Sequence, residues 1–510
     1  MKILDCTLRD GGYYTNWDFD DATLGPYLKA MDSLPVDVVE VGYRSNPSAG
    51  YLGQFGYSPV SSLKVIKASC SKKIAIMLNE KSVRTGDLET LLMPISGIVD
   101  IVRLAVDPSN FDRALDLSRA IRKMGFIVSF NMMYMSTWKS IEGIYAKIAN
   151  LEGAADVFCM VDSFGGITPE EVKDTVSGIR EVSSITLGFH GHDNLELGLI
   201  NTLTAMKLGV EYVDATILGM GRGAGNLKLE LLLSYLNRRD GVDVDFNVLS
   251  DAIVAFEPLR DKYRWETSLP YMISGANDIP QKEVMSWVSN RLYSFNSIVR
   301  ALDNRRNHRK DNARFPILPQ KKKYASAVII GGGMNAATHS KAITSFLSRH
   351  PDYAVIFATA RHAAPYLGIA NDHYYCITGN EGKRLMDTVG EDARKGVCVL
   401  PPYPREMGTD VPECVRESSF ELKEVGFIDA YADSVTAIAL ELASEISSGD
   451  VFLVGYDGYP GKVLSEKERT LTEENMKIFN AFCKSTGRGL KSLTPSIYSN
   501  LIPMSVYQYL

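Results

Sequence analysis

Short apolar runs alternate with longer amphipathic stretches over residues 1 to about 226. We predict eight strands from these runs, at residues 2–7, 36–43, 73–78, 100–106, 126–133, 156–162, 185–191 and 212–218. Each of the first seven is followed by enough chain for a helix, and near-continuous apolar strands with such connections indicate parallel pairing with both faces covered. The pattern predicts an α/β fold, a (β/α)₈ TIM barrel over residues 1–230. An open doubly wound sheet is the alternative, but it rarely needs eight units.

The pattern changes after residue 230. Residues 231–303 carry apolar positions at helical spacing, which predicts a helical extension that packs on the barrel. Residues 304–324 are rich in basic side chains and predict a solvated linker, with an anion-binding flap as the alternative. From Ala325 to the end, a strand within 326–339 and further apolar runs at 353–360, 373–379, 396–402 and 450–458 predict a second, Rossmann-like α/β domain with an open sheet of fewer than eight strands.

Composition narrows the function classes. The chain has 510 residues, 45% hydrophobic and 23% charged, as in ordinary globular proteins. Its 61 acidic residues outnumber 55 Lys and Arg, which argues against nucleic acid as the main partner. Neither a signal peptide nor an apolar run long enough to cross a membrane is recognisable. The seven cysteines form no C-x-x-C pair, so we expect a reducing, cytoplasmic location rather than a disulfide framework.

Histidine placement is the most informative chemical feature. Only His190 and His192 lie in the first 300 residues, both within the segment GFHGHDN. Residues two apart on a strand point to the same side, so this pair is expected at the carboxyl end of the seventh strand, where barrel enzymes carry their catalytic groups. Two adjacent imidazoles can chelate a divalent metal, whereas the alternative is a pair of hydrogen-bonded core histidines.

A metal needs further ligands, and Asp10 in the segment TLRDGG is the expected carboxylate at the mouth of the first strand. Arg9 and Asp10 cannot both point inward from a regular strand. We therefore expect the strand to end or bulge near Leu8, with Gly11 and Gly12 permitting a turn. Arg9 would then hold a fixed charge beside the metal, suited to a carboxylate or a developing enolate.

Three segments, LDCTLRDGGYY (4–14), HGHDN (190–194) and GMGRGAGN (219–226), carry a resemblance to a known family. Together they resemble the DRE-TIM metallolyases over residues 1–300, and residues 264–284 look most like the aldolase branch. The resemblance implies that Asp10, His190 and His192 bind Mn²⁺ or Mg²⁺, that Asn226 ligates or adjoins the metal, and that Arg9 steadies the substrate enolate. It also implies a homodimer.

The implied activity is that of a metal-dependent carbon–carbon lyase or aldolase. The substrates would be pyruvate or another 2-oxo acid, handled as a metal-stabilised enolate, and an aldehyde or related electrophile. The fused second domain suggests biosynthesis of an unusual metabolite or sugar. Two alternatives stay open: a Claisen-type transferase that condenses an acyl-CoA with a 2-oxo acid, and a barrel that has lost activity and serves as a binding module.

The chain departs from the aldolase pattern at Tyr13, where those enzymes usually have a proton-relaying histidine. The general base would then be Tyr13 itself, metal-bound hydroxide or a carboxylate such as Glu40. Arg103 lies inside an apolar strand and would bind a substrate carboxylate or form an ion pair with Glu40 or a neighbour. Asn131 and Asp162 end predicted strands and would either contact substrate or orient a loop.

Two glycine-rich segments have two interpretations each. GMGRGAGN would bind phosphate through its amides or make a tight turn that brings Asn226 to the metal. In the second domain, Gly331, Gly332, Gly333 and Asn335 follow a strand and predict either a turn that binds an anion or nucleotide or a tight turn without ligand.

Overall fold

A computed structural model describes residues 1–510 except 291–294, 310–313, 320–322, 406–410 and 460–465. The chain divides into two compact units, Met1–Ser286 and Trp287–Leu510. Each unit is described by itself. Parts of the predicted basic linker, 310–313 and 320–322, lie outside the described residues.

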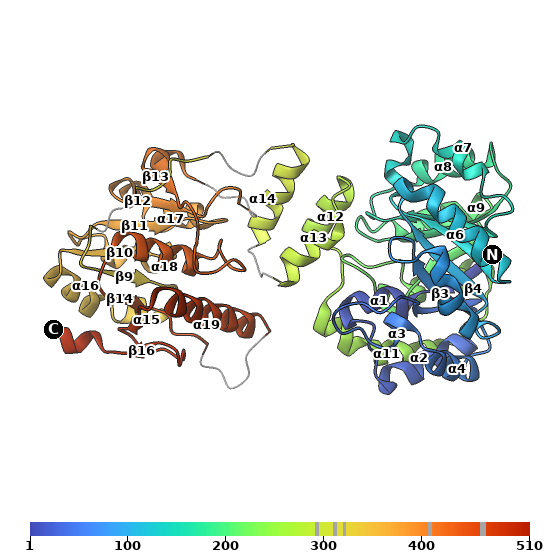
Figure 1. Ribbon diagram of the computed structural model, residues 1–510, viewed down its shortest axis with the longest axis horizontal. Coiled ribbons are helices and arrows are strands. Elements are labelled where there is room, and N and C mark those ends of the chain that lie inside the picture. Colours follow the sequence, from blue (N-terminus) through green and yellow to red (C-terminus); the bar gives the residue numbers. More distant parts are fainter. Residues whose placement is uncertain (291–294, 310–313, 320–322, 406–410, 460–465) are drawn as a thin grey trace. The chain divides into compact units, whose positions relative to one another are not determined.

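The first unit is a closed barrel of eight parallel strands, which confirms the predicted TIM barrel (Figure 1). The first strand pairs with both the second and the eighth and so closes the ring. The strands are β1 (Lys2–Asp5), β2 (Val38–Tyr43), β3 (Lys73–Asn79), β4 (Ile101–Val106), β5 (Ile127–Met132), β6 (Val157–Asp162), β7 (Thr186–Gly191) and β8 (Tyr212–Ala215).

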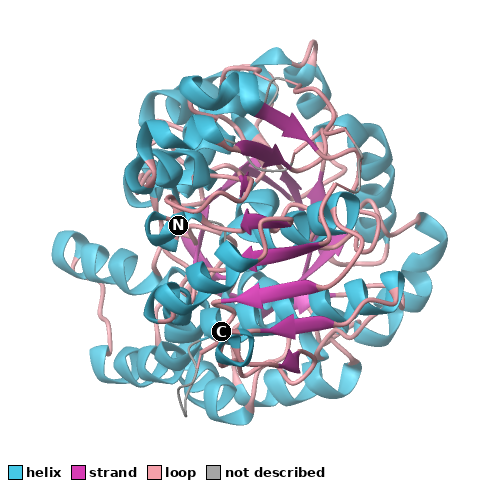
Figure 2. Ribbon diagram, turned by 90° about the vertical axis from the view of Figure 1, so that its left-hand side faces the viewer, coloured by secondary structure: helices cyan, strands magenta, loops and turns pink. Residues whose placement is uncertain are grey.

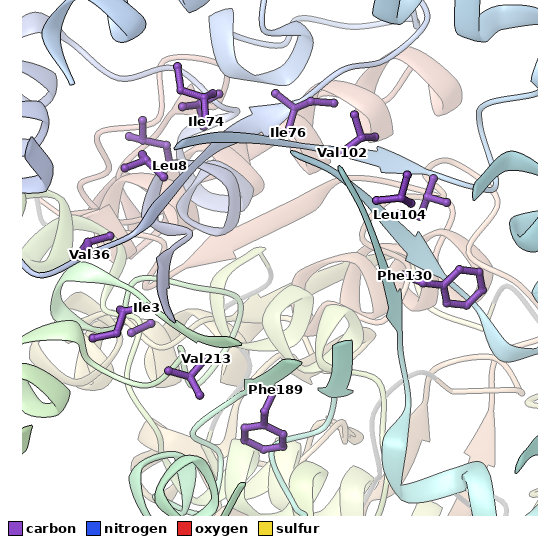
Figure 3. Packing of buried hydrophobic residues seen from close by; sticks show 14 of the residues in the cluster. Ile3, Leu8, Val36, Ile74, Ile76, Val102, Leu104, Phe130, Phe189 and Val213 are labelled. Carbon is purple, nitrogen blue, oxygen red and sulfur yellow. The ribbon is translucent and has the colours of Figure 1, made fainter. Parts of the chain in front are cut away.

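Strand alternation separates an apolar outer layer from a mixed interior. Outward-facing residues such as Ile76, Val102 and Phe130 are buried against the surrounding helices, and Figure 3 shows several of them around the ring of strands. A small apolar cluster that includes Leu4 and Ala75 is separate from this outer layer. Because neighbours along a strand face opposite ways, the residues between the outer positions point into the barrel.

Helices follow the strands of the barrel and continue beyond them. They are α1 (Thr7–Thr15), α2 (Asp21–Ser33), α3 (Gln54–Tyr57), α4 (Val60–Ser69), α5 (Leu88–Leu92), α6 (Phe111–Lys123), α7 (Ile144–Ala149), α8 (Pro169–Arg180), α9 (Gly198–Lys207), α10 (Leu229–Asp240), α11 (Phe246–Tyr263), α12 (Leu269–Ala276) and α13 (Gln281–Met285). The predicted helical character of the segment after residue 230 is confirmed, and α11 packs against α2.

The expected turn at Gly11 and Gly12 is wrong. β1 already ends at Asp5, and both glycines lie inside α1. They are required for close packing rather than for a turn, because a Cβ on Gly11 would lie 2.5 Å from the sulfur of Met220 and one on Gly12 would lie 2.0 Å from the ring of Trp17. The helix, rather than a bulge, places Arg9 and Asp10 at the barrel mouth.

The second unit is an open sheet of eight parallel strands, so the expectation of fewer than eight is wrong. The strand order is β13-β12-β11-β10-β9-β14-β15-β16, and Figure 2 shows strands of this sheet side by side. The bounds are β9 (Ser326–Ile330), β10 (Tyr353–Phe357), β11 (His373–Cys376), β12 (Val397–Leu400), β13 (Ser419–Glu421), β14 (Val451–Val454), β15 (Leu490–Ser492) and β16 (Ile502–Pro503).

Helices cover both faces of this sheet, as expected for a doubly wound fold. Alternate strand residues feed two separate apolar clusters, one that contains Ile329 and Ile356 and one that contains Val328 and Phe357. The helices of this unit are α14 (Phe295–Arg306), α15 (Met334–Thr338), α16 (Ser340–Arg349), α17 (Glu381–Thr388), α18 (Val435–Ile446) and α19 (Glu466–Thr486). In the described part of the chain, no helix has the length and apolar character required to cross a bilayer, and all seven cysteines are free thiols.

Candidate metal centre at the barrel mouth

His190 and His192 come from the carboxyl end of β7 and lie side by side, as predicted from strand alternation. Both are buried, and their ring centroids are 5.0 Å apart. Nδ1 of His190 lies 2.9 Å from an oxygen of Asp214, and Nδ1 of His192 lies 2.7 Å from the backbone carbonyl of Asp162. An acceptor at Nδ1 fixes the proton there and leaves the Nε2 lone pair available for a metal.

Asp10 on α1 completes a compact ligand set with the two histidines. One potential ligand atom from each of the three side chains lies within 4.8 Å of the others, and Nε2 of His190 is 3.6 Å from Asp10. Asn226 donates a hydrogen bond of 2.5 Å from its amide nitrogen to Asp10. The buried Oδ1 of Asn226 has no hydrogen-bond partner among the described residues. Two imidazole nitrogens, a carboxylate and a free amide oxygen fit a hard divalent cation such as Mg²⁺ or Mn²⁺.

The electrostatics of the site keep Asp10 and His192 in their metal-binding protonation states. Burial opposes ionisation of Asp10, but Arg9 and the two histidines hold its pKa well below the usual range. Burial, assisted by the neighbouring His190, lowers the pKa of His192 to about 3. At neutral pH the carboxylate is therefore charged and the His192 imidazole is neutral, as metal binding requires.

Six buried side chains, which we call the charge ring, link the metal ligands to the barrel interior: Arg9, Asp10, Glu40, Arg103, His190 and Asp214. Arg9 donates to Asp10 at 2.5 Å and to Glu40 at 2.9 Å. Arg103 donates to Glu40 at 2.9 Å and to Asp214 at 2.5 Å, and Asp214 contacts His190. With its carboxylates ionised and His190 neutral, the ring holds three negative and two positive groups, a net charge of −1.

The ion pair between Arg103 and Glu40, one of the two roles considered for Arg103, is present in this ring. Glu40 lies between Arg9 and Arg103, and its second oxygen is buried without a partner among the described residues. Asn131 neighbours Arg103. With its amide oriented to satisfy both groups, its oxygen lies 2.6 Å from Nη2 of Arg103.

Asp162 orients a loop. Its carboxylate accepts hydrogen bonds from the backbone N–H groups of Gly165, Gly166 and Ile167 at 2.9, 3.3 and 3.2 Å. Burial raises the pKa of Asp162 to about 7 despite these bonds. Its backbone carbonyl holds His192, so the loop and the histidine are fixed by the same residue.

Tyr13 lies on α1 and faces a second tyrosine. Its hydroxyl is 2.8 Å from the hydroxyl of Tyr43, and the guanidinium of Arg222 lies 4.5 Å from the centre of its ring. Trp17 packs edge-on against the same ring. The side chain of Tyr13 is therefore held in an aromatic and cationic environment.

In the second unit, the glycine turn after β9 receives a carboxylate from the protein itself. Asp457, which follows β14, accepts a hydrogen bond of 2.9 Å from the backbone N–H of Asn335. A Cβ on Gly333 would lie 2.5 Å from the carboxyl carbon of Asp457. The carboxylate of Asp457 thus lies against the glycine turn, beside Gly333 and the N–H of Asn335.

Sequence reasoning missed three residues of the site: Asp214, Tyr43 and Arg222. Asp214 was detectable in principle, because an aspartate in the middle of the apolar run YVDATIL must have a buried partner. Arg222 lies within GMGRGAGN, where only the glycines and Asn226 were considered. Tyr43 carried no signal, because its proximity to Tyr13 depends on the three-dimensional packing of α1 against β2.

The fold and the site together define a TIM-barrel protein with a metal-type centre at the carboxyl ends of its strands. The family model described as HMGL-like matches residues 1–255, half of the chain. The chain belongs to the HMGL-like family, a lyase family that includes the aldolases found among its relatives.

Curated relatives and a solved structure agree with this assignment. A 4-hydroxy-2-oxovalerate aldolase of Pelotomaculum thermopropionicum is 32% identical over 51% of this chain and 77% of that protein. The enzyme of the same name from Geobacillus genomosp. 3 is 29% identical over 51% of this chain and 78% of that protein. The solved structure "Crystal structure of the N-terminal domain of a putative aldolase from Bacteroides vulgatus" is 59% identical, with a TM-score of 0.57, and covers 59% of this chain and 100% of that one.

Proposed function

We propose that this protein is a divalent-metal-dependent carbon–carbon lyase that cleaves or forms a 4-hydroxy-2-oxo acid. The observation that carries the proposal is the convergence of Asp10, His190 and His192, whose ligand atoms lie within 4.8 Å of one another. The named aldolase relatives supply the substrate class. In the cleavage direction, the bond between C3 and C4 breaks and the 4-hydroxyl loses its proton to give the aldehyde. The electron pair passes to the 2-oxo acid as its enolate, which is then protonated at C3.

Asp10, His190, His192 and the free oxygen of Asn226 are the residues that would hold the cation. Bound there, Mg²⁺ or Mn²⁺ would act as a Lewis acid toward the keto and carboxylate oxygens of pyruvate or another 2-oxo acid and stabilise its enolate. A divalent charge added to the charge ring changes its net charge from −1 to +1, which is complementary to a monoanionic 2-oxo acid.

Arg9 holds a positive charge next to this position. Its contacts to Asp10 and Glu40 fix the guanidinium, and it is only 7% exposed. A fixed charge in a water-poor site stabilises a developing oxyanion without reorganisation during the reaction. Tyr13, with its hydroxyl shared with Tyr43, is the candidate to move the proton of the 4-hydroxyl.

The proposal extends to the setting of the enzyme. It would act in the cytoplasm on a small 2-oxo acid and an aldehyde or related electrophile, as a homodimer, in the biosynthesis of an unusual metabolite or sugar. The expected four-part organisation, with a barrel, a helical extension, a basic linker and a second domain, is part of the same proposal.

Exchange of the methyl protons of pyruvate into D₂O, followed by NMR, tests the function without knowledge of the aldehyde. We expect exchange with Mn²⁺ or Mg²⁺ and its loss in His190→Ala. His339→Ala, which removes a histidine that contacts Tyr507 in the second unit, is the matched control and should retain exchange. Absence of exchange with pyruvate and other 2-oxo acids while metal is bound would contradict the lyase assignment.

A further inference from the structure

Arg222 is a cation of the barrel mouth that forms no ion pair with a carboxylate of the described residues. It lies in the loop GMGRGAGN after β8 and is half-buried. Among the residues that the structure describes, it forms no ion pair, and its buried Nε has no hydrogen-bond partner. Its observed contact is the face of the Tyr13 ring, 4.5 Å from the guanidinium. Arg9 and Arg103, by contrast, each bind two carboxylates.

The loop holds Arg222 at this place. Gly221 packs against Asn226, since a Cβ there would lie 2.5 Å from the Asn226 amide nitrogen. Gly223 has a φ of +63° and its carbonyl accepts a hydrogen bond from Tyr14. The residues on either side of Arg222 are therefore fixed by the metal-ligand candidate Asn226 and by α1.

Arg222 flanks the proposed metal site. It stacks on Tyr13, three residues after Asp10 on α1, and the neighbouring Gly221 packs against Asn226, whose oxygen is a candidate ligand. This position places the guanidinium beside a substrate bound at the metal. A half-buried guanidinium without a carboxylate partner has unused donors suited to carboxylate or phosphate oxygens.

The sum of the formal charges at the site indicates which substrate would carry the anionic group. With the divalent cation and a monoanionic 2-oxo acid in place, the charge ring and its contents sum to zero. Arg222 then adds a positive charge that this ring does not compensate. We propose that Arg222 binds an anionic group, a carboxylate or a phosphate, on the aldehyde partner, so that this lyase selects an anionic aldehyde over a neutral one. This inference rests on the proposed function for the identity of the first substrate.

Binding of small anions to the metal-free protein tests the inference apart from catalysis. Calorimetric titration with succinate and with inorganic phosphate would compare wild type, Arg222→Gln and Arg222→Lys. The matched control is Arg239→Gln, which removes an exposed arginine that also stacks on a tyrosine, at 5.3 Å from Tyr235. We expect at least one of the two anions to bind at least tenfold more weakly to Arg222→Gln, and near wild-type affinity in Arg239→Gln. No detectable binding of either anion to wild type, or equal binding to Arg222→Gln, would overturn the proposal.

Catalysis then distinguishes the sources of the anion. Pyruvate would be paired with succinic semialdehyde or its neutral analogue butanal, and with glyceraldehyde 3-phosphate or glyceraldehyde. We expect Arg222→Gln to lower kcat/KM at least tenfold for one of the two anionic aldehydes and to change it less than threefold for the neutral ones. The affected aldehyde identifies the carboxylate or the phosphate as the recognised group.

Two results would overturn the inference while leaving the proposed function intact. One is an equal loss for neutral and anionic aldehydes. The other is an increase in the KM for pyruvate in the D₂O exchange assay, which would show that Arg222 binds the 2-oxo acid instead. If wild type shows no exchange at all, the proposed function fails, and the calorimetric comparison still decides whether Arg222 is an anion site.

Discussion

Asp214 is the residue of the barrel interior that we expect to set the metal affinity, because it fixes the position of the proton on His190. Its Oδ2 accepts hydrogen bonds from Arg103 at 2.5 Å and from Nδ1 of His190 at 2.9 Å. Burial opposes its ionisation, but Arg103 and His190 lower the pKa of Asp214. Asp214→Asn keeps the shape and removes the charge. If the amide nitrogen faces His190, it donates to Nδ1, so the ring proton moves to Nε2 and the histidine loses its ligand lone pair.

The structure sets the size of two effects. Removing one partner of a buried ion pair costs about 3–5 kcal/mol, and we expect the lower end because Glu40 still holds Arg103. Loss of a hydrogen-bond partner behind a metal-ligating histidine weakens metal binding roughly 10- to 100-fold. Asp214 touches neither the proposed ligand position of Asp10 nor that of His192, so both effects would pass through His190 and Arg103.

Two measurements on Asp214→Asn separate these effects. Chemical unfolding in EDTA gives the change in stability, and titration with Mn²⁺ gives the change in affinity. The matched control is Asp156→Asn at the start of β6. Asp156 pairs with the partly exposed Arg122 at 3.1 Å, so its loss should cost about 1 kcal/mol or less and leave Mn²⁺ affinity unchanged. A folded Asp214→Asn protein that binds Mn²⁺ within twofold of wild type would refute the role given to the His190–Asp214 contact.

Three further outcomes follow from the geometry. Saturation with Mn²⁺ at about 100 times its Kd should raise the unfolding free energy of wild type by about 2.7 kcal/mol, an increase that EDTA reverses and that His190→Ala abolishes in thermal unfolding. Gly221→Ala should weaken Mn²⁺ binding, because its Cβ would displace the Asn226 amide, whereas Gly25→Ala, with open space around it in α2, should retain binding. Burial raises the pKa of Asp5 from 3.8 to about 6, so the folded state binds its proton more tightly than the unfolded state. The contribution of Asp5 to stability should therefore fall by about 2 kcal/mol as the pH rises from 4 to 6. Chemical denaturation in EDTA, repeated across this pH range, should show the unfolding free energy of Asp5→Asn rising relative to that of wild type. If the two unfolding free energies change in parallel with pH, the raised pKa of Asp5 is contradicted.

The sequence predicted the parts of the molecule that depend on strand periodicity. The pairing of His190 and His192 followed from alternation. The ion pair of Arg103 followed from the cost of an unpaired charge in an apolar strand. Periodicity failed where the chain leaves a strand early. The apolar start of the sequence does not show that β1 ends at Asp5, because the helix that follows is stabilised by packing of Gly11 against Met220, more than 200 residues away.

The short strands at and near the edges of the second sheet were missed for a related reason. β13, β15 and β16 have only two or three residues each, too few for an alternating pattern to be distinguished from a loop. Their pairing depends on the strands that lie beside them in the sheet, such as β14 for β15. In both cases the end or the pairing of the strand depends on contacts with residues far away in the sequence, which a local pattern does not contain.

The polar interior of this barrel is itself an argument for a bound cation. Inward positions of TIM-barrel strands are usually filled by branched apolar side chains. Here Glu40, Arg103, His190 and Asp214 occupy such positions on β2, β4, β7 and β8, all nearly inaccessible to solvent. Burying these groups is costly, and an apolar layer of the same volume would be at least as stable. The ring has one more carboxylate than guanidinium groups, so a bound cation would offset its excess negative charge. The two Nε2 atoms and the free oxygen of Asn226 mark where that charge would lie.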